Sequence, residues 1–181
     1  RCRQSMIKRK YRALYLSDRK RFGDEKFALL RESGLRFMWV LRHCEVSNNP
    51  LWLFLLYRMR MKYGLEIGPR VDIGPGFYIG HAFNISINPS VKIGKNVNIH
   101  RGAVIGQENR GSRCGTPVIG DNVWIGVNAV IVGKVSVGSD VLIAPNTYVN
   151  RDIPSHSIVL GNPCQIISSV NATEGYLNNV I

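Results

Sequence analysis

Cysteine is scarce in this sequence and shows no regular spacing. Its four cysteines, Cys2, Cys44, Cys114 and Cys164, form no Cys-X-X-Cys pair. Such scatter argues against a zinc site and against a disulfide framework. We therefore expect no metal, and a reducing cytoplasm as the environment of the protein.

Long apolar runs are missing as well. The longest one, from Leu51 to Tyr57, ends at Arg58 and falls well short of the roughly 18 residues that a membrane-spanning helix needs. The sequence therefore predicts no span, which leaves only peripheral contact with a membrane open.

Acidic residues are few: 12 Asp and Glu stand against 24 Lys and Arg. The imbalance is local, because residues 1–62 hold 16 basic and 5 acidic residues, whereas residues 63–181 hold 8 and 7. We interpret residues 1–62 as a basic α-helical N-terminal segment. Ser17-Asp18 and the stretch from Ser47 to Pro50 are its candidate helix starts.

A six-residue cadence of aliphatic side chains, many followed by glycine, runs through the rest of the chain. It comprises Ile67, Ile73, Ile79, Ile87, Ile93, Ile99, Ile105, Ile119, Ile125, Ile131, Val137, Ile143 and Val149. This period fits neither an amphipathic helix nor an alternating strand. It is typical of hexapeptide solenoids, in which each repeat forms one flat of a triangular parallel β-helix. We predict an all-β solenoid of about four coils over residues 63–168.

Two places break the cadence. The step from Ile79 to Ile87 has two extra residues, and the step from Ile105 to Ile119 has eight more than two repeats require. Insertions in solenoids leave as loops on a working face, so we expect a protruding loop at 107–116. Residues 169–181 are expected to form a loosely held C-terminal tail.

The first irregularity gathers polar side chains. Three repeats bring Ile99 over Ile79 and therefore His100 over Gly80, beside His81, while Glu66 falls near the corner below. A carboxylate that holds an imidazole in one tautomer makes it an effective general base near neutral pH. We predict His81 as the base and Glu66 as its orienting partner, with His100 as a substrate-binding or packing residue. Surface histidines without function are the alternative.

These residues carry a family resemblance. The segment 77–82 (Phe-Tyr-Ile-Gly-His-Ala), the cadence and the segment 158–163 (Ile-Val-Leu-Gly-Asn-Pro) resemble the left-handed β-helix acyltransferases of the hexapeptide-repeat family. The resemblance is greatest to the serine acetyltransferase branch and its polysaccharide-modifying relatives. It implies a left-handed coil and a homotrimer, with acetyl-CoA or another acyl-CoA in the groove between neighbouring solenoids.

The same resemblance suggests the remaining site residues. His81 stands where the catalytic histidine of serine acetyltransferases stands, and Glu66 replaces its partnering aspartate. Positions that line the pantetheine arm of CoA correspond to Gly126, Val127, Ala144 and Pro145. Lys134 or Arg151 would supply a basic contact to CoA, and Arg110 and Arg113 of the loop would contact the acceptor.

Two differences from the serine acetyltransferase branch determine which acceptor we expect. An aspartate that grips the serine amine is Gly80 here, and an Asp-Arg-His stretch that holds the serine carboxylate is Cys114-Gly115-Thr116. Because charge-assisted contacts supply discrimination, we expect a sugar or lipid-linked glycan hydroxyl as acceptor, in surface polysaccharide biosynthesis. Serine O-acetylation and a non-catalytic trimeric scaffold are the alternatives.

The basic segment 1–62 has three interpretations. No recognised motif supports nucleic-acid binding, so no nucleic acid is expected. Solvated helices packed at the base of the trimer are the simplest interpretation. The third is contact with anionic lipid through the apolar helix that ends in Arg58, Arg60 and Lys62, which would place a cytoplasmic protein at the inner face of the membrane.

Overall fold

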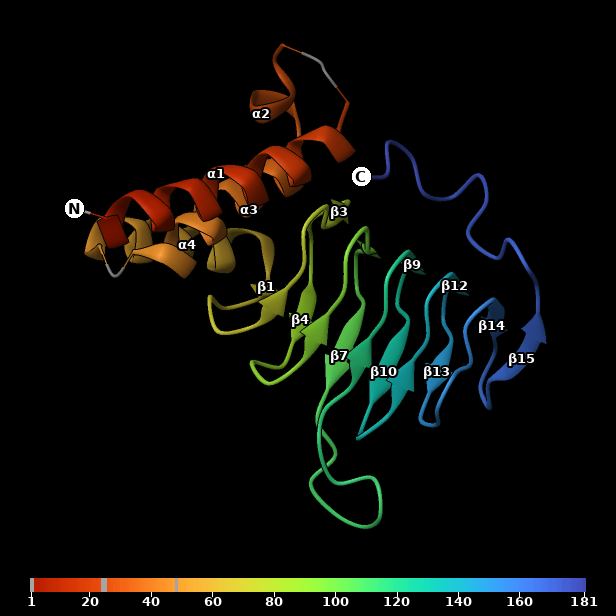
Figure 1. Cartoon of the computed structure of the whole chain (residues 1–181). Helices are drawn as coiled ribbons and strands as arrows, with labels where there is room; N and C mark the ends of the chain where they lie inside the picture. The colour runs from red at the N-terminus through yellow and green to blue at the C-terminus, as the bar shows by residue number, and fades with distance from the viewer. Residues whose placement is uncertain (1, 24–25, 48) are drawn as a thin grey trace.

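The computed structural model describes the backbone of residues 2–23, 26–47 and 49–181, with side chains from residue 11 onward in those ranges. Four helices precede a parallel β-helix (Figure 1). They are α1 (Cys2–Arg21), α2 (Ala28–Arg31), α3 (Ser33–Val46) and α4 (Pro50–Tyr63). Among the described residues, no helix is both long enough and apolar enough to cross a membrane.

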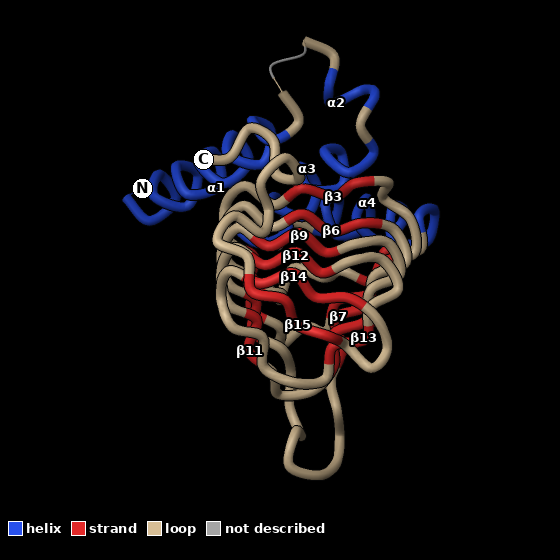
Figure 2. The backbone as a smooth tube through the Cα atoms, turned by 90° about the vertical axis from the view of Figure 1, so that its right-hand side faces the viewer, coloured by secondary structure: helices blue, strands red, loops and turns tan. Residues whose placement is uncertain are grey.

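The solenoid consists of three sheets, one on each of its faces, and Figure 2 looks onto sheet C, whose strands follow one below another from β3 to β15. The first, sheet A, contains β1 (Leu65–Glu66), β4 (Ile85–Ile87), β7 (Val104–Gly106), β10 (Val130–Val132) and β13 (Tyr148–Val149). Sheet B contains β2 (Asp72–Ile73), β5 (Lys92–Ile93), β8 (Val118–Ile119) and β11 (Ser136–Val137). Sheet C contains β3 (Tyr78–Gly80), β6 (Asn98–His100), β9 (Val123–Ile125), β12 (Val141–Ile143), β14 (Ser157–Leu160) and β15 (Gln165–Ser168).

Strand register confirms the solenoid predicted from the cadence. Ile79 pairs with Ile99, and Ile125 pairs with Ile143. The aliphatic positions point inward and are buried, Ile99 and Ile125 at 0% exposure. Sheet A stacks five parallel strands over residues 65–149, so the stack reaches about five coils rather than the four that the cadence alone made visible.

The glycines after the sheet B aliphatics have a steric reason. A Cβ placed on Gly94 would lie 2.6 Å from the Gly120 carbonyl oxygen, and one on Gly120 would lie 2.7 Å from the Gly138 carbonyl. Successive coils approach too closely at this corner for any side chain. The glycine in the aliphatic-Gly pattern is therefore required by the close packing of successive backbones.

Helix α3 closes the base of the solenoid. A Cβ on Gly34 would lie 2.3 Å from the carbonyl oxygen of Ile79, so this helix lies directly on the first coil, and Phe37 and Leu41 are fully buried there. Helix α4 starts where the sequence predicts. The side chain of Asn49 accepts a hydrogen bond from the Leu51 amide, and Gly64 ends the helix in the left-handed conformation.

The other predicted helix start is wrong. Helix α1 runs through Asp18 without a break, and this carboxylate is used instead in a buried ion pair. It accepts from Arg42 Nε at 2.8 Å and from the Phe77 amide at 2.9 Å. Arg42 in turn donates to the carbonyl oxygens of Ile73 and Gly74 at 2.8 and 2.7 Å. This network joins α1, α3 and the first coil.

The C-terminal tail is held more firmly than predicted. The predicted tail, 169–181, follows β15, which pairs antiparallel with β14 at the edge of sheet C farthest from the helices, and it returns along that sheet toward the end of α1 (Figure 1). Thr173 donates to Asp140 through both its amide and its hydroxyl, at 3.0 and 2.7 Å. Further down, Arg21 Nε donates to the Asn178 carbonyl at 2.8 Å. Polar side chains of the solenoid and of α1 thus dock a segment whose own sequence carries no regular pattern.

Candidate active site

The corner that follows β3 carries the predicted catalytic histidine. Between Gly80 and Ile85 the chain uses four residues, whereas the coil above uses two between His100 and Ala103. His81 opens this insertion with φ +54°, a left-handed conformation that costs a residue with a side chain roughly 1–3 kcal/mol. The side chain is exposed. The insertion therefore lifts an imidazole out of an otherwise regular wall.

His100 lies where coil counting places it. It pairs with Gly80 across β3 and β6, and an electrostatic interaction links its ring to His81. Its Nδ1 lies 3.0 Å from the carbonyl oxygen of Ile125, so Nδ1 carries the proton and Nε2 keeps a lone pair. Burial is the main cause that lowers the pKa of His100, and His81 lowers it further. The ring is therefore neutral at pH 7.

Glu66 has a different hydrogen-bond partner from the one predicted. Its Oε2 accepts from the hydroxyl of Ser86 at 2.8 Å. Both residues lie on sheet A, Glu66 in β1 and Ser86 in β4, the strand that follows the His81 corner. They line a cleft of about 400 Å³ together with Arg60 and Asn84. The orienting role of Glu66 toward His81 stays a prediction. It requires the carboxylate to turn from Ser86 toward the corner.

The predicted pantetheine-lining positions form a column above the His81 corner. Sheet C register places Gly126 over His100 and Ala144 over Gly126. The Asn146 amide donates to the carbonyl of Val127 at 2.9 Å, and a Cβ on Gly126 would lie 2.6 Å from the nitrogen of Pro145. Pro145 stands three coils above His81, about 14 Å at the usual strand spacing. A backbone-lined strip thus leads along the corner to the imidazole.

The predicted basic contacts lie at another corner, between sheets A and B. There the 107–116 loop leaves the coil, with an antiparallel bridge between Glu108 and Gly115. Arg113 is paired with Glu108 at 3.0 Å and accepts a hydrogen bond from the Lys134 amide through its carbonyl at 2.8 Å.

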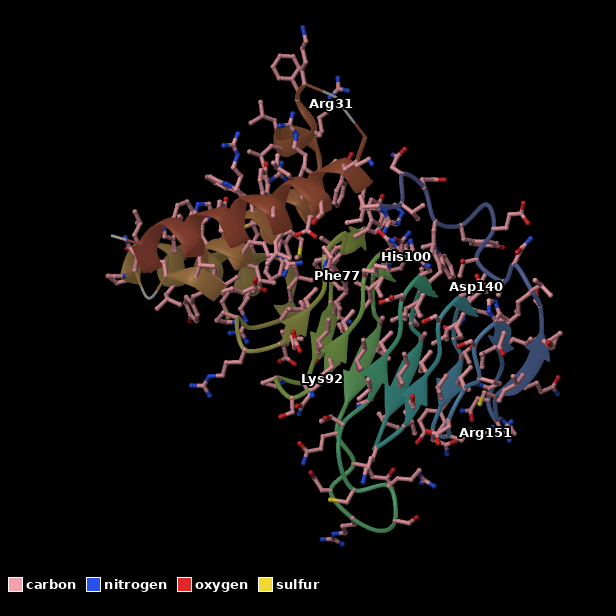
Figure 3. The ribbon with its side chains drawn as sticks, in the orientation of Figure 1. Arg31, Phe77, Lys92, His100, Asp140 and Arg151 are labelled. Carbon is pink, nitrogen blue, oxygen red and sulfur yellow. The ribbon has the colours of Figure 1, made fainter. Side chains whose placement is uncertain are left out.

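The other two predicted cations share that corner. Arg151 donates to the carbonyl of Cys164 and lies at the solenoid edge opposite His100 in Figure 3. Arg110 is exposed on the loop. Within one chain, these residues and Lys134 are separated from His81 by the width of sheet A. Their predicted contacts with CoA and acceptor therefore require a neighbouring subunit.

One group of residues was missed by the sequence analysis. Trp124 and Tyr78 project outward from sheet C in one column with Asn98, and Tyr176 of the tail meets the Trp124 ring edge-on at 5.1 Å. With Arg21 they line a cleft beside His100. Aromatic residues at outward positions of a solenoid were the available signal. No group of three or more His, Cys, Asp or Glu forms a metal site in the described part of the chain.

Comparison with known proteins defines the class. Residues 116–151 match the bacterial transferase hexapeptide family, whose model has six repeats. Residues 116–151 therefore share the repeat of the hexapeptide transferases, and the chain is similar in sequence and fold to serine acetyltransferases.

The similar proteins are named serine acetyltransferases. Serine acetyltransferase 2 of Arabidopsis thaliana is 32% identical over 67% of this chain and 38% of its own length. That of Staphylococcus xylosus is 37% identical over 58% of this chain and 48% of its own. The soybean enzyme structure has a TM-score of 0.75 at 26% identity, covering 87% of this chain and 69% of that one. The chain thus spans less than half the length of these curated relatives.

These relatives correct the predicted acceptor. A sugar or lipid-linked glycan, and with it a role in polysaccharide biosynthesis, was expected because two serine-holding motifs are absent. Curated relatives and solved structures similar to this chain carry the name serine acetyltransferase, so the sugar interpretation is wrong. The inference failed because the absence of two motifs in Gly80 and in residues 114–116 does not by itself exclude serine.

Proposed function

We propose that the chain is an acetyl-CoA-dependent O-acetyltransferase with serine as acceptor. The observation that carries the proposal is the exposed His81 at an irregular corner, at the foot of the strip formed by Gly126, Val127, Ala144 and Pro145. The sequence similarity to serine acetyltransferases supports the choice of acceptor.

The chemistry follows from that placement. His81 takes the proton of the serine hydroxyl as the oxygen attacks the thioester carbonyl of acetyl-CoA, forming a tetrahedral intermediate. Collapse of the intermediate breaks the carbon–sulfur bond, transfers the acetyl group to oxygen, and lets the imidazolium return its proton to the CoA thiolate. Glu66, once turned toward His81, would stabilise the imidazolium.

A homotrimer is part of the proposal. Lys134, Arg151 and the loop residues Arg110 and Arg113 lie away from His81 in their own chain. A groove between neighbouring solenoids would bring them toward the site of the next subunit, where cations suit the phosphates of CoA.

The test is thiol release from acetyl-CoA with L-serine, by wild type and by His81→Ala. We expect release that depends on serine and falls by about 10²- to 10⁴-fold in the variant, which is the usual contribution of a general base. Lys92→Gln, an exposed change on sheet B, serves as the control. Serine-dependent release that is equal in wild type and His81→Ala would refute His81 as the base, and no release by the wild type would favour the non-catalytic scaffold.

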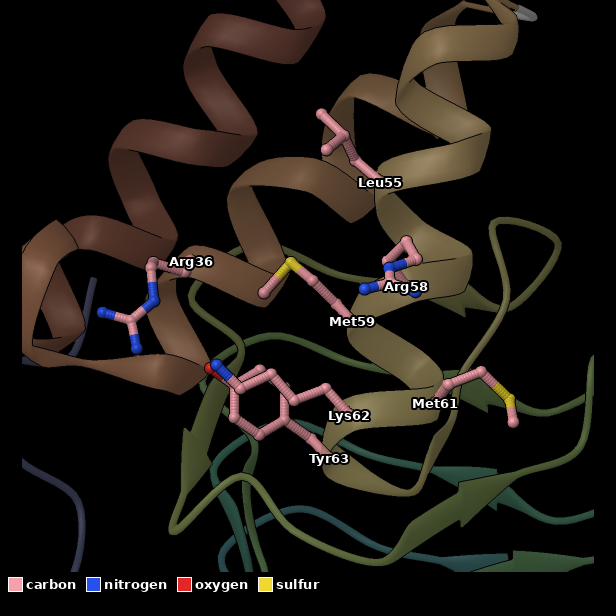
Figure 4. Close-up of a pocket in the computed structure, with 7 residues that line it drawn as sticks. All are labelled: Arg36, Leu55, Arg58, Met59, Met61, Lys62 and Tyr63. Atoms are coloured by element: carbon pink, nitrogen blue, oxygen red, sulfur yellow. The ribbon is translucent and has the colours of Figure 1, made fainter.

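We further propose that helix α4 touches an anionic membrane surface from the cytoplasmic side. The side chains of Leu51, Phe54 and Met61 are exposed at 60, 58 and 69%, and α4 contains no acidic residue. Its last turns carry Arg58 and Lys62, which border a cleft of about 530 Å³ shown in Figure 4. A helix with apolar and basic side chains at its surface suits an anionic bilayer.

Co-sedimentation with vesicles tests this contact. We expect binding to phosphatidylglycerol vesicles at low salt, loss of binding at high salt, and weak binding to phosphatidylcholine. Phe54→Ser/Met61→Ser should abolish binding, whereas Ile167→Ser, an exposed apolar change on β15, should not. The side chains of residues 1–10, which belong to the predicted basic segment, lie outside the described ones. No binding to anionic vesicles at low salt would refute the contact.

A further inference from the structure

A polar cleft on the outer face of sheet C reaches His100, which pairs with Gly80, the residue before His81. It holds about 320 Å³ and is lined by residues of sheet C, the end of α1 and the C-terminal tail, and His100 is one of them. Figure 3 labels His100. Arg21, Glu32, Tyr78, Asn98 and Tyr176 are among the residues that line it. Its walls come from three parts of the chain that lie far apart in the sequence, so the fold, rather than any one motif, builds it.

The imidazole of His100 is held rigidly in this cleft. The Nδ1–H donates to the Ile125 carbonyl at 3.0 Å, and the ring packs against Trp124 at a centroid distance of 4.7 Å. With Nδ1 committed, the group presented to the cleft is the Nε2 lone pair, a hydrogen-bond acceptor.

Gly80 makes room for that acceptor. A Cβ built on Gly80 would lie 2.6 Å from Cδ2 and 2.7 Å from Nε2 of His100. The imidazole edge therefore occupies the space of a side chain at residue 80, immediately before His81. The His100 ring can occupy its position only because residue 80 has no side chain.

The charges around the cleft favour a cation. Arg21 is buried, and its three nitrogens donate to the Asn178 carbonyl, the Gly76 carbonyl and Asn98 Oδ1 at 2.7–2.8 Å. Glu32, at the start of α3, is exposed and acts electrostatically on Tyr78, whose pKa is raised by burial first and by this carboxylate second. The lining of the cleft thus offers a neutral nitrogen acceptor and a carboxylate, while its one guanidinium is already engaged.

We propose that this cleft binds the ammonium group of the acceptor, which donates to Nε2 of His100 while Glu32 supplies the compensating charge. The inference rests on the proposed function and deepens it. In serine the ammonium and the hydroxyl stand on neighbouring carbons, so an ammonium at His100 leaves the hydroxyl beside His81. The site thereby recognises an amino alcohol from a position other than residue 80.

The test compares two substitutions of His100 in the full chain. His100→Leu removes the acceptor at similar size, and His100→Gln restores an acceptor oxygen. We expect His100→Leu to raise the KM for serine by about 10- to 100-fold, as for the loss of a hydrogen bond to a charged group, and to leave the KM for acetyl-CoA unchanged. His100→Gln should recover part of the loss. Gly80→Ala should act as His100→Leu does, and the two together should be less than additive.

The specific readout is discrimination for the amine. Wild type should prefer serine to 3-hydroxypropanoate, which lacks the ammonium, and His100→Leu should lose most of that preference. An unchanged preference in His100→Leu, in an enzyme whose wild type acetylates serine, overturns this inference and leaves the proposed function standing.

A binding measurement tests the inference even if the protein transfers no acetyl group to serine. The ring ¹⁵N resonance of His100 Nε2 should shift when serine is added to wild type, and should not shift with 3-hydroxypropanoate. No shift with serine overturns the cleft assignment even if no acetyl transfer is detected. Absence of transfer together with a serine-induced shift would refute the proposed function alone.

Discussion

Replacement of Arg42 by methionine tests what fastens the helical segment to the solenoid. Arg42 and Asp18 are 1% and 0% exposed, and the substitution would leave the Asp18 carboxylate buried without its counter-ion. It would also leave the carbonyl oxygens of Ile73 and Gly74 without their donors. Breaking a buried pair from one side costs about 3–5 kcal/mol. For a chain of this length, that lowers the melting temperature by roughly 6–20 °C.

Urea unfolding at one fixed protein concentration measures this effect, because assembly would make stability depend on concentration. Tryptophan fluorescence reports Trp39 and Trp52 in the helices together with Trp124 in sheet C, and circular dichroism reports the whole chain. Arg113→Met is the matched control, since its ion pair with Glu108 is exposed and worth at most about 1 kcal/mol.

A second variant separates pairing from packing. In Asp18→Leu/Arg42→Met both charges are removed, and stability should return toward wild type, because apolar replacements of a buried pair are often neutral. If Arg42→Met costs no more than Arg113→Met, the network does not fasten the helices, and the reasoning is refuted.

Three further predictions concern the solenoid and its tail. Gly120→Ala should destabilise by about 1–3 kcal/mol or more, because its Cβ meets the backbone of the next coil at 2.7 Å, whereas Gly68→Ala, with nothing within 4 Å, should stay within about 0.5 kcal/mol in the same urea titration. Glu66→Gln should lower kcat for acetyl transfer with little change in the KM for either substrate, and an unaltered kcat would show that this carboxylate does not assist His81. A hydrogen bond to Asp140 raises the pKa of His156. The contribution of protonated His156 to tail docking is therefore full below the ordinary histidine pKa near 6.5 and is lost as the pH rises through the raised pKa. Limited proteolysis of the tail should be faster at pH 8.5 than at pH 6, and His156→Gln should remove that difference.

Much of the solenoid was predictable because its rule is local and repeated. The inward Ile residues recur at each flat, and the glycine after each sheet B strand follows from coil spacing, so counting residues located His100 over Gly80. The two-residue insertion at His81 was visible for the same reason, because the step from Ile79 to Ile87 is longer than the regular six residues.

What escaped prediction depends on interactions between distant segments. Asp18 has the composition of a helix start, yet burial against Arg42, 24 residues away, decides its role. Nothing in residues 169–181 announces that Asp140 and Arg21 will hold them. The acceptor was mispredicted for a related reason, because the absence of an aspartate at Gly80 does not by itself exclude serine.

The two ends of the β-helix carry a consequence for aggregation. A stack of parallel strands is an open template at either end, able in principle to recruit another chain and grow as a fibre. Here α3 lies across the lower end, and the antiparallel β15 occupies the upper edge of sheet C. Reversal of strand direction at β15 interrupts the parallel repeat, so an incoming coil meets the wrong hydrogen-bonding pattern. Helix α3 and strand β15 thereby prevent the open ends of the β-helix from adding further chains and growing into a fibre.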